Sequence, residues 1–70
     1  MNMNEEIIFK IENGVGIITL NRPERLNALT YNIVHKMNDY LDKCEGDDDI
    51  KCVIIEGSGE KAFCAGGDVV

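Results

Sequence analysis

The run AFCAGGD, residues 62–68, gathers the residue types most capable of chemistry: a thiol, two adjacent glycines and a carboxylate. Paired glycines need a backbone reason, because they have no side chains of their own. They can form a tight turn between a strand and a helix. Alternatively, a backbone N–H of the pair can face negative charge that develops on a substrate oxygen. The residue types alone leave these two interpretations equally open.

Four other features suggest chemistry, and each has a simpler explanation. GSGEKA, residues 57–62, matches the glycine pattern of dinucleotide-binding loops, but the helical periodicity that such a loop requires does not follow it. The acidic run 47–49 lacks the glycine and distal glutamate of a calcium loop and is typical of a solvated turn. His35 has no partner at useful spacing, so a surface position is expected. Cys64 has no evident His–Asp pair, which favours a small buried apolar role.

Composition limits the classes of function. The chain has 70 residues, of which 13 are acidic and 7 basic, and its net charge is −6. This charge disfavours non-specific binding to nucleic acid, because the phosphates would be repelled. The three cysteines show no CxxC spacing, so we predict neither a disulfide framework nor a metal site. No stretch approaches about 20 apolar residues, so no membrane span is predicted.

The strands that must position the glycine run come first in the chain. Alternating apolar residues in EEIIFKIE, residues 5–12, predict a strand. The Asn-Gly pair at 13–14 is a strong hairpin signal, and VGIITL, residues 15–20, predicts the second strand. Pro23 then ends the strand, because it cannot donate to a sheet ladder. We expect an antiparallel hairpin.

A helix and a third strand follow. Apolar residues three and four positions apart in residues 30–45 predict a helix, with Thr30 as its N-cap and Gly46 as its stop. IKCVIIEG, residues 50–57, predicts a strand whose near-continuous apolar run suits coverage on both faces, as in a parallel sheet. Strand, helix and strand together predict a βαβ unit.

These elements predict an α/β fold made of a β-hairpin plus a βαβ unit that ends in a glycine-rich loop. Such a unit leaves sheet edges unpaired and the helix without most of its partners. We therefore expect residues 1–70 to be the amino-terminal part of one larger domain, so that the domain is incomplete in this chain. No internal repeat or linker divides the chain.

Three stretches, in the expected order, resemble the crotonase (enoyl-CoA hydratase/isomerase) superfamily over roughly residues 7–70. GIITLNRPERLNAL, residues 16–29, is similar to the early strand and coenzyme A loop of that family. IKCVIIEGSGEKAFCAGGD, residues 50–68, is similar to its next strand and oxyanion loop. The helix between them has the expected length. The resemblance implies the amino-terminal portion of a crotonase (ClpP/crotonase-like ββα) fold.

The resemblance also implies roles for individual residues. Gly67 would supply one backbone N–H of an oxyanion hole, which binds the thioester carbonyl oxygen as it becomes an enolate or a tetrahedral oxyanion. Gly66 and Ala65 would shape the turn, with the Ala65 backbone near the adenine, and Asp68 would cap the loop. Either Arg22 or Lys61 would meet the phosphates. The full set implied for coenzyme A binding is Arg25, Ala28, Leu29, Lys61, Ala65, Gly66, Gly67 and Asp68.

KAFCAGGD, residues 61–68, is especially similar to 3-hydroxyisobutyryl-CoA hydrolases of valine catabolism. That branch implies a CoA-thioester hydrolase, with coenzyme A as part of the substrate and no permanently bound cofactor. An enoyl-CoA hydratase or isomerase is the alternative, because some of these enzymes carry a similar A-G-G-D. Family members also imply a homo-oligomer, in the bacterial cytoplasm or, in a eukaryote, the mitochondrial matrix, although no transit peptide is visible.

The family places its second oxyanion N–H and its catalytic carboxylates downstream of this loop. The 70 residues alone are therefore expected to lack turnover. A second hypothesis, from another class, is a non-catalytic fragment that pairs its open sheet edge with a partner chain.

Overall fold

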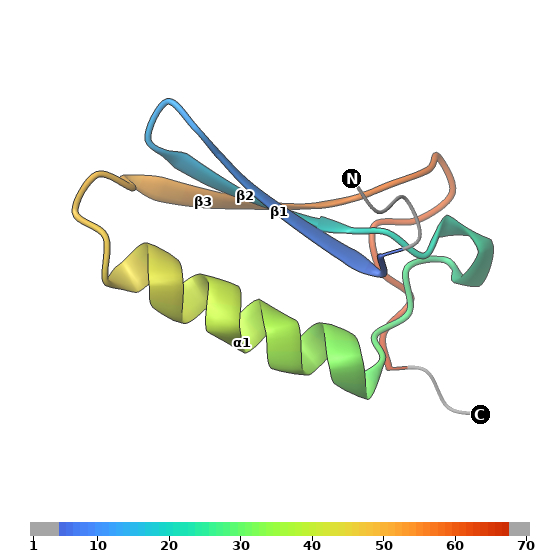
Figure 1. The fold of residues 1–70 in the computed structure, drawn as a ribbon. Helices are drawn as coiled ribbons and strands as arrows, with labels where there is room; N and C mark the ends of the chain where they lie inside the picture. Colours follow the sequence, from blue (N-terminus) through green and yellow to red (C-terminus); the bar gives the residue numbers. More distant parts are fainter. Residues whose placement is uncertain (1–4, 68–70) are drawn as a thin grey trace.

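The computed structural model describes residues 5–67, which form three strands, one α-helix and one short 3-10 turn (Figure 1). In chain order the elements are β1 (Ile7–Glu12), β2 (Val15–Leu20), η1 (Pro23–Arg25), α1 (Tyr31–Glu45) and β3 (Cys52–Gly57). The predicted strands and helix are thus confirmed, and η1 occupies the segment in which Pro23 was predicted to end the strand.

The three strands form one sheet in the order β1-β2-β3. β1 and β2 are antiparallel, and the hairpin between them turns at Asn13 and Gly14, whose φ angles are +50° and +79°. Two positive φ angles in a two-residue turn match the twist of the flanking strands. β2 and β3 are parallel, and α1 connects them along one face of the sheet (Figure 1). The predicted hairpin and βαβ unit are both confirmed.

The core lies between α1 and the face of the sheet that it covers. Phe9 of β1 and Tyr40 of α1 stack within it, with ring centroids 4.7 Å apart. Cys44 is also buried, and a Cβ at Gly16 would lie only 2.7 Å from its sulfur, so the end of α1 approaches β2 closely. The apolar side chains that are at most 1% exposed are Ile7, Ile18, Leu20 and Ile33.

The ends of α1 are where the sequence predicts them. The hydroxyl of Thr30 accepts a hydrogen bond from the N–H of Ile33 at 3.1 Å, and the same hydroxyl donates to Glu6 at 3.0 Å. The predicted N-cap is therefore confirmed and is tied to the start of β1. Gly46 ends the helix with φ −83° and ψ −1°, so the stop does not use the left-handed conformation that glycine permits.

The expectation that β3 is covered on both faces is wrong for the residues that the structure describes. β3 is an edge strand that pairs only with β2. Val53, Ile54 and Ile55 are 36%, 48% and 39% exposed. The physical reason is that α1 lies mainly against β1 and β2, which leaves the apolar run of β3 without a covering layer within residues 5–67.

Candidate functional site

Two loops meet at one end of the sheet. Residues 21–29 follow β2 and residues 58–67 follow β3, and the two segments lie side by side beyond the strand ends (Figure 1). They stay in contact because β2 and β3 are parallel, so both strands deliver their loops to the same edge. In open α/β sheets this carboxyl edge is where ligands bind.

Backbone hydrogen bonds hold the glycine run against the first loop. The N–H of Ala65 donates to the carbonyl of Leu26 at 2.9 Å, and the N–H of Leu29 donates to the carbonyl of Gly66 at 2.7 Å. Leu29 and Gly67 form a parallel bridge. Four of the predicted site residues, Leu29, Ala65, Gly66 and Gly67, are thus brought together.

The N–H of Gly67 points away from this contact. In a planar trans peptide the C=O and the following N–H point in opposite directions. Because the Gly66 carbonyl points at the N–H of Leu29, the N–H of Gly67 is directed outward. Gly67 is exposed, and among residues 5–67 its N–H has no hydrogen-bond acceptor. The arrangement therefore presents one fixed, unused donor at the surface.

The two glycines have different requirements. Gly66 has φ +97°, a left-handed conformation that L side chains rarely adopt. Gly67 has no such angle, and a Cβ there would meet nothing within 4 Å. The backbone therefore needs glycine at position 66, whereas within residues 5–67 a methyl group fits at position 67.

Asn27 is the central residue of the loop contact, although it was not among the predicted site residues. Its side chain is fully buried. The side-chain oxygen accepts from the N–H of Arg22, and the side-chain nitrogen donates to the carbonyls of Ser58 and Ala62, each at 2.9 Å. The one available signal was a polar residue beside two apolar ones in RLNAL, and that pattern is also typical of an ordinary turn.

Arg22 takes part in the same contact. Its Nη1 donates to the carbonyl of Ala28 at 2.8 Å, and its Nε lies 3.3 Å from a carboxylate oxygen of Glu6. The Arg22 side chain is only 12% exposed. The structure therefore uses this guanidinium inside the loop contact, so of the two cations predicted to meet phosphates, Lys61 is the exposed one.

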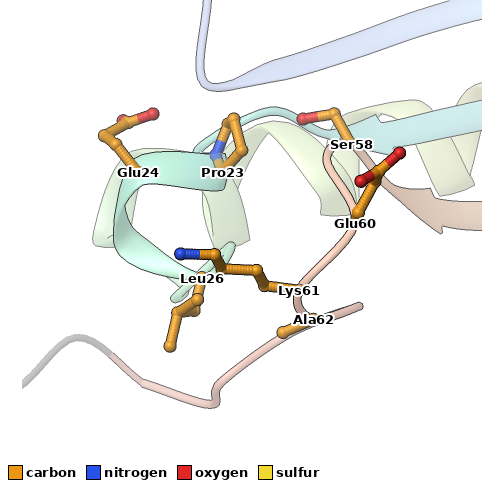
Figure 2. Close-up of a pocket in the computed structure, with 7 residues that line it drawn as sticks. All are labelled: Pro23, Glu24, Leu26, Ser58, Glu60, Lys61 and Ala62. Carbon is orange, nitrogen blue, oxygen red and sulfur yellow. The ribbon is translucent and has the colours of Figure 1, made fainter.

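Lys61 lies at a surface cavity of about 330 Å³ between the two loops (Figure 2). Figure 2 shows its side chain extending from the second loop toward the turn that carries Pro23 and Leu26. The loops approach closely here, because a Cβ at Gly59 would lie 2.8 Å from the Pro23 side chain. The lining residues are Pro23, Glu24, Leu26, Ser58, Glu60, Lys61 and Ala62.

Two further predicted binding residues, Arg25 and Ala28, lie in the first loop. Arg25 is the last residue of η1 and is exposed, whereas Ala28 is buried. Asp68 lies outside the described residues.

The other candidate features mostly follow their simpler explanations. Cys64 is half-buried against the core, and its sulfur accepts from the N–H of Gly66 at 3.4 Å. His35 is exposed on α1, and the acidic run 47–49 forms a turn in which Asp47 accepts from the N–H of Asp49. Residues 58–67 contain no helix, so the dinucleotide-loop interpretation fails within the described part of that segment. Within residues 5–67, no three His, Cys, Asp or Glu side chains are grouped to hold a metal ion.

A sequence model of the enoyl-CoA hydratase/isomerase family matches residues 15–70. The chain belongs to this family. It is 50% identical over 64 residues to the mitochondrial 3-hydroxyisobutyryl-CoA hydrolase of Danio rerio, and 48% identical over 65 residues to that of Homo sapiens. These alignments cover 91% and 93% of this chain but only 17% of each relative.

A solved structure agrees with the family assignment. The carnitinyl-CoA dehydratase of Mycobacterium thermoresistibile superposes with a TM-score of 0.90 at 45% identity, covering 93% of this chain and 19% of that one. The predicted crotonase superfamily and fold are therefore confirmed for this family member. No helix among the described residues is long and apolar enough to cross a membrane.

Proposed function

We propose that these 70 residues are the amino-terminal part of an enzyme that hydrolyses an acyl-CoA thioester of the 3-hydroxyisobutyryl-CoA type, in valine catabolism. The observation that carries the proposal is the outward N–H of Gly67, held in place by the bond between Leu29 and the Gly66 carbonyl. The hydrolase relatives that align over 91% or more of this chain support the choice of reaction.

The proposed chemistry requires a donor at the thioester oxygen. Attack of water on the carbonyl carbon forms a C–O bond and moves an electron pair onto the oxygen. The Gly67 N–H then hydrogen-bonds this oxyanion more strongly than the original carbonyl. Collapse of the intermediate breaks the C–S bond, and the proton lost from water ends on the coenzyme A sulfur. A carboxylate from the part of the enzyme beyond residue 70 would transfer that proton.

Coenzyme A would lie along the two loops as part of the substrate. Lys61 offers an exposed ammonium group for a phosphate at the cavity edge, and the backbone of residues 65–67 lies next to the first loop. Arg25, Ala28 and Leu29 would complete the binding surface from that loop, and Asp68 would cap the second loop.

Two substitutions at one position test this function in the complete protein. Gly67→Pro removes the N–H, and Gly67→Ala keeps it and places a methyl group in open space. With 3-hydroxyisobutyryl-CoA as substrate and free thiol as the readout, we expect kcat of the Pro variant to fall about 100- to 1,000-fold. The Ala variant should stay within about threefold of wild type. Equal activity in the two variants would contradict the proposal.

An enoyl-CoA hydratase activity is the second candidate, favoured by the similarity to the Mycobacterium dehydratase. Such an enzyme adds water across a double bond and leaves the thioester intact. Incubation with crotonyl-CoA separates the two: loss of the conjugated double bond without thiol release indicates a hydratase, and thiol release from 3-hydroxyisobutyryl-CoA indicates a hydrolase.

The isolated 70-residue chain should have no turnover, because the carboxylate that would transfer the proton is proposed to lie beyond residue 70. Its exposed β3 and open sheet edge also indicate an incomplete layer within residues 5–67. Thiol release above background by this chain, abolished by Gly67→Pro, would contradict that expectation. A cooperatively folded monomer in size-exclusion chromatography and circular dichroism would argue against an incomplete fragment.

A further inference from the structure

The buried amide of Asn27 has no direct part in the proposed reaction, yet it contacts both loops of the site. Its orientation is fixed by the chemistry of its partners. The carbonyls of Ser58 and Ala62 can only accept hydrogen bonds, and the N–H of Arg22 can only donate one. Both amide hydrogens are therefore used. An aspartate at this position has no donor, and a serine has only one.

The backbone conformation around Asn27 also favours an asparagine in this contact. Leu26 and Asn27 have φ angles of +54° and +57°, and asparagine is among the side chains that tolerate this conformation best. The N–H of Asn27 donates to the carbonyl of Arg22 at 2.8 Å, which closes the turn. A Cβ at Gly57 would lie 2.7 Å from the Asn27 amide nitrogen and would also collide with the carbonyl of Phe63. The bare Gly57 thus leaves the space that the amide and the second loop occupy.

Residues 26–29, which include Asn27, contact both ends of residues 62–67. The Asn27 amide holds the carbonyl of Ala62, where residues 62–67 begin. The residues that hold the other end of that segment are the neighbours of Asn27 in sequence, Leu26 and Leu29. Residues 26–29 therefore act as one support, and Asn27 is its side-chain contact.

We propose that Asn27 is a positioning residue for the Gly67 N–H: through the Ala62 carbonyl it sets where residues 62–67 lie against the substrate oxygen. This inference rests on the proposed function. A donor must lie about 2.7–3.1 Å from the developing oxyanion, so a small displacement of the loop weakens the bond in the transition state. Misplacement by 1 Å can lower a rate by about 100-fold.

The test uses the complete protein with Asn27→Ala, and Asn21→Ala as the matched control. Asn21 is also an asparagine of the first loop. Its side chain donates a hydrogen bond to the Glu5 carbonyl and accepts one from the Ser58 hydroxyl, but it makes no hydrogen bond to Ala62. For Asn27→Ala we expect kcat per folded molecule to fall about 10- to 100-fold. KM should change by less than about threefold, because ground-state binding is largely kept. Asn21→Ala should keep its kcat even though its stability falls.

A spectroscopic reading separates positioning from loss of fold. Isobutyryl-CoA labelled with ¹³C at the thioester carbonyl reports the hydrogen bond through its C=O stretching frequency. In Asn27→Ala the band of the bound ligand should move toward the frequency of the free ligand, and in Asn21→Ala it should match wild type. A wild-type band and a wild-type kcat in Asn27→Ala would overturn the inference.

Misfolding of the variant and failure of the proposed function can each be distinguished from failure of this inference. If Asn27→Ala does not fold, Asn27→Gly gives the same two readings, because glycine adopts the positive φ without strain. Failure of the proposed function has a different signature, because the wild-type protein itself would then neither bind isobutyryl-CoA nor release thiol.

Discussion

The contact between residues 22–29 and 58–67 contains many hydrogen bonds. By contrast, the apolar side chains of β3, the strand that precedes residues 58–67, are exposed. In the loop contact the buried amide of Asn27 has three partners, and no buried side-chain nitrogen or oxygen within residues 5–67 lacks one. Along β3, by contrast, Val53, Ile54 and Ile55 are all more than a third exposed. The difference shows that contacts within residues 5–67 are enough to fix the geometry of the two loops, whereas they are not enough to bury β3.

This division has a physical basis. Hydrogen bonds between two adjacent loops need only the segments that make them, and here both segments lie within 70 residues. Apolar burial needs a second layer, and α1 alone covers only part of one face. Substitutions in the loop contact should therefore disturb the fold strongly, and substitutions on the outer surface of β3 should disturb it little.

The largest effect is expected from Asn27→Asp. A carboxylate would replace two donors and would lie buried against the carbonyls of Ser58 and Ala62. We expect the free energy of unfolding to fall by about 3–5 kcal/mol, measured by urea denaturation of the complete protein. Asn38→Asp, at an exposed position on α1, is the control and should change stability by less than about 0.5 kcal/mol. Equal stability of the two variants would mean that the amide does not hold the loops.

Gly57→Ala should have the next largest effect. The added methyl group would press on the backbone carbonyl of Phe63 and on the Asn27 amide, which is buried and hydrogen-bonded to both loops. Overpacking of this kind costs about 1–3 kcal/mol, read from the same denaturation curves. Unchanged stability would indicate that residues 58–63 can move away freely, contrary to the fixed contact described here.

A smaller difference should separate the two adjacent glycines, Gly66 and Gly67. Gly66→Ala places a side chain at φ +97° and should cost about 1–2 kcal/mol. Gly67→Ala meets no atom within 4 Å and should be neutral within about 0.5 kcal/mol. Thermal denaturation of both variants checks the order, and a Gly67→Ala variant that is less stable than Gly66→Ala would contradict it.

The smallest effect on stability is expected on β3. Ile54→Lys replaces a side chain that is 48% exposed within residues 5–67, so the free energy of unfolding of the isolated 70-residue chain should fall by no more than about 1 kcal/mol. The charge should also reduce self-association of the 70-residue chain, because lysine on an exposed edge opposes strand pairing. Light scattering measures that change. A large loss of stability, with association unchanged, would place Ile54 in a covered layer.

The local features of this fold could be predicted from the sequence. The β1 strand, the Asn13-Gly14 turn and the Thr30 cap each depend on residues a few positions apart, and all three are present. Burial along β1 does not alternate, because Ile11 is 46% exposed. The backbone requirement for glycine in the run 66–67 is also confirmed at Gly66, which has φ +97°, a conformation that favours glycine.

The long-range features could not be predicted in the same way. Asn27 bonds to Ser58 and Ala62, which are 31 and 35 residues away, and no spacing rule connects them. Arg22 was one of two cations expected to meet phosphates, but its partners within the chain are visible only once β1 and both loops are placed in space. β3 has the composition of a covered strand, yet coverage depends on a layer that composition does not supply.

One measurement tests the central claim most directly: the amide resonance of Gly67 in the complete, ¹⁵N-labelled protein, followed by NMR as isobutyryl-CoA is added. Free coenzyme A, which has no thioester carbonyl, is the control ligand. If the outward Gly67 N–H binds the thioester oxygen, its proton resonance should move downfield and its exchange with solvent should slow with isobutyryl-CoA but not with coenzyme A. A Gly67 amide that is unchanged while isobutyryl-CoA is bound would contradict the account.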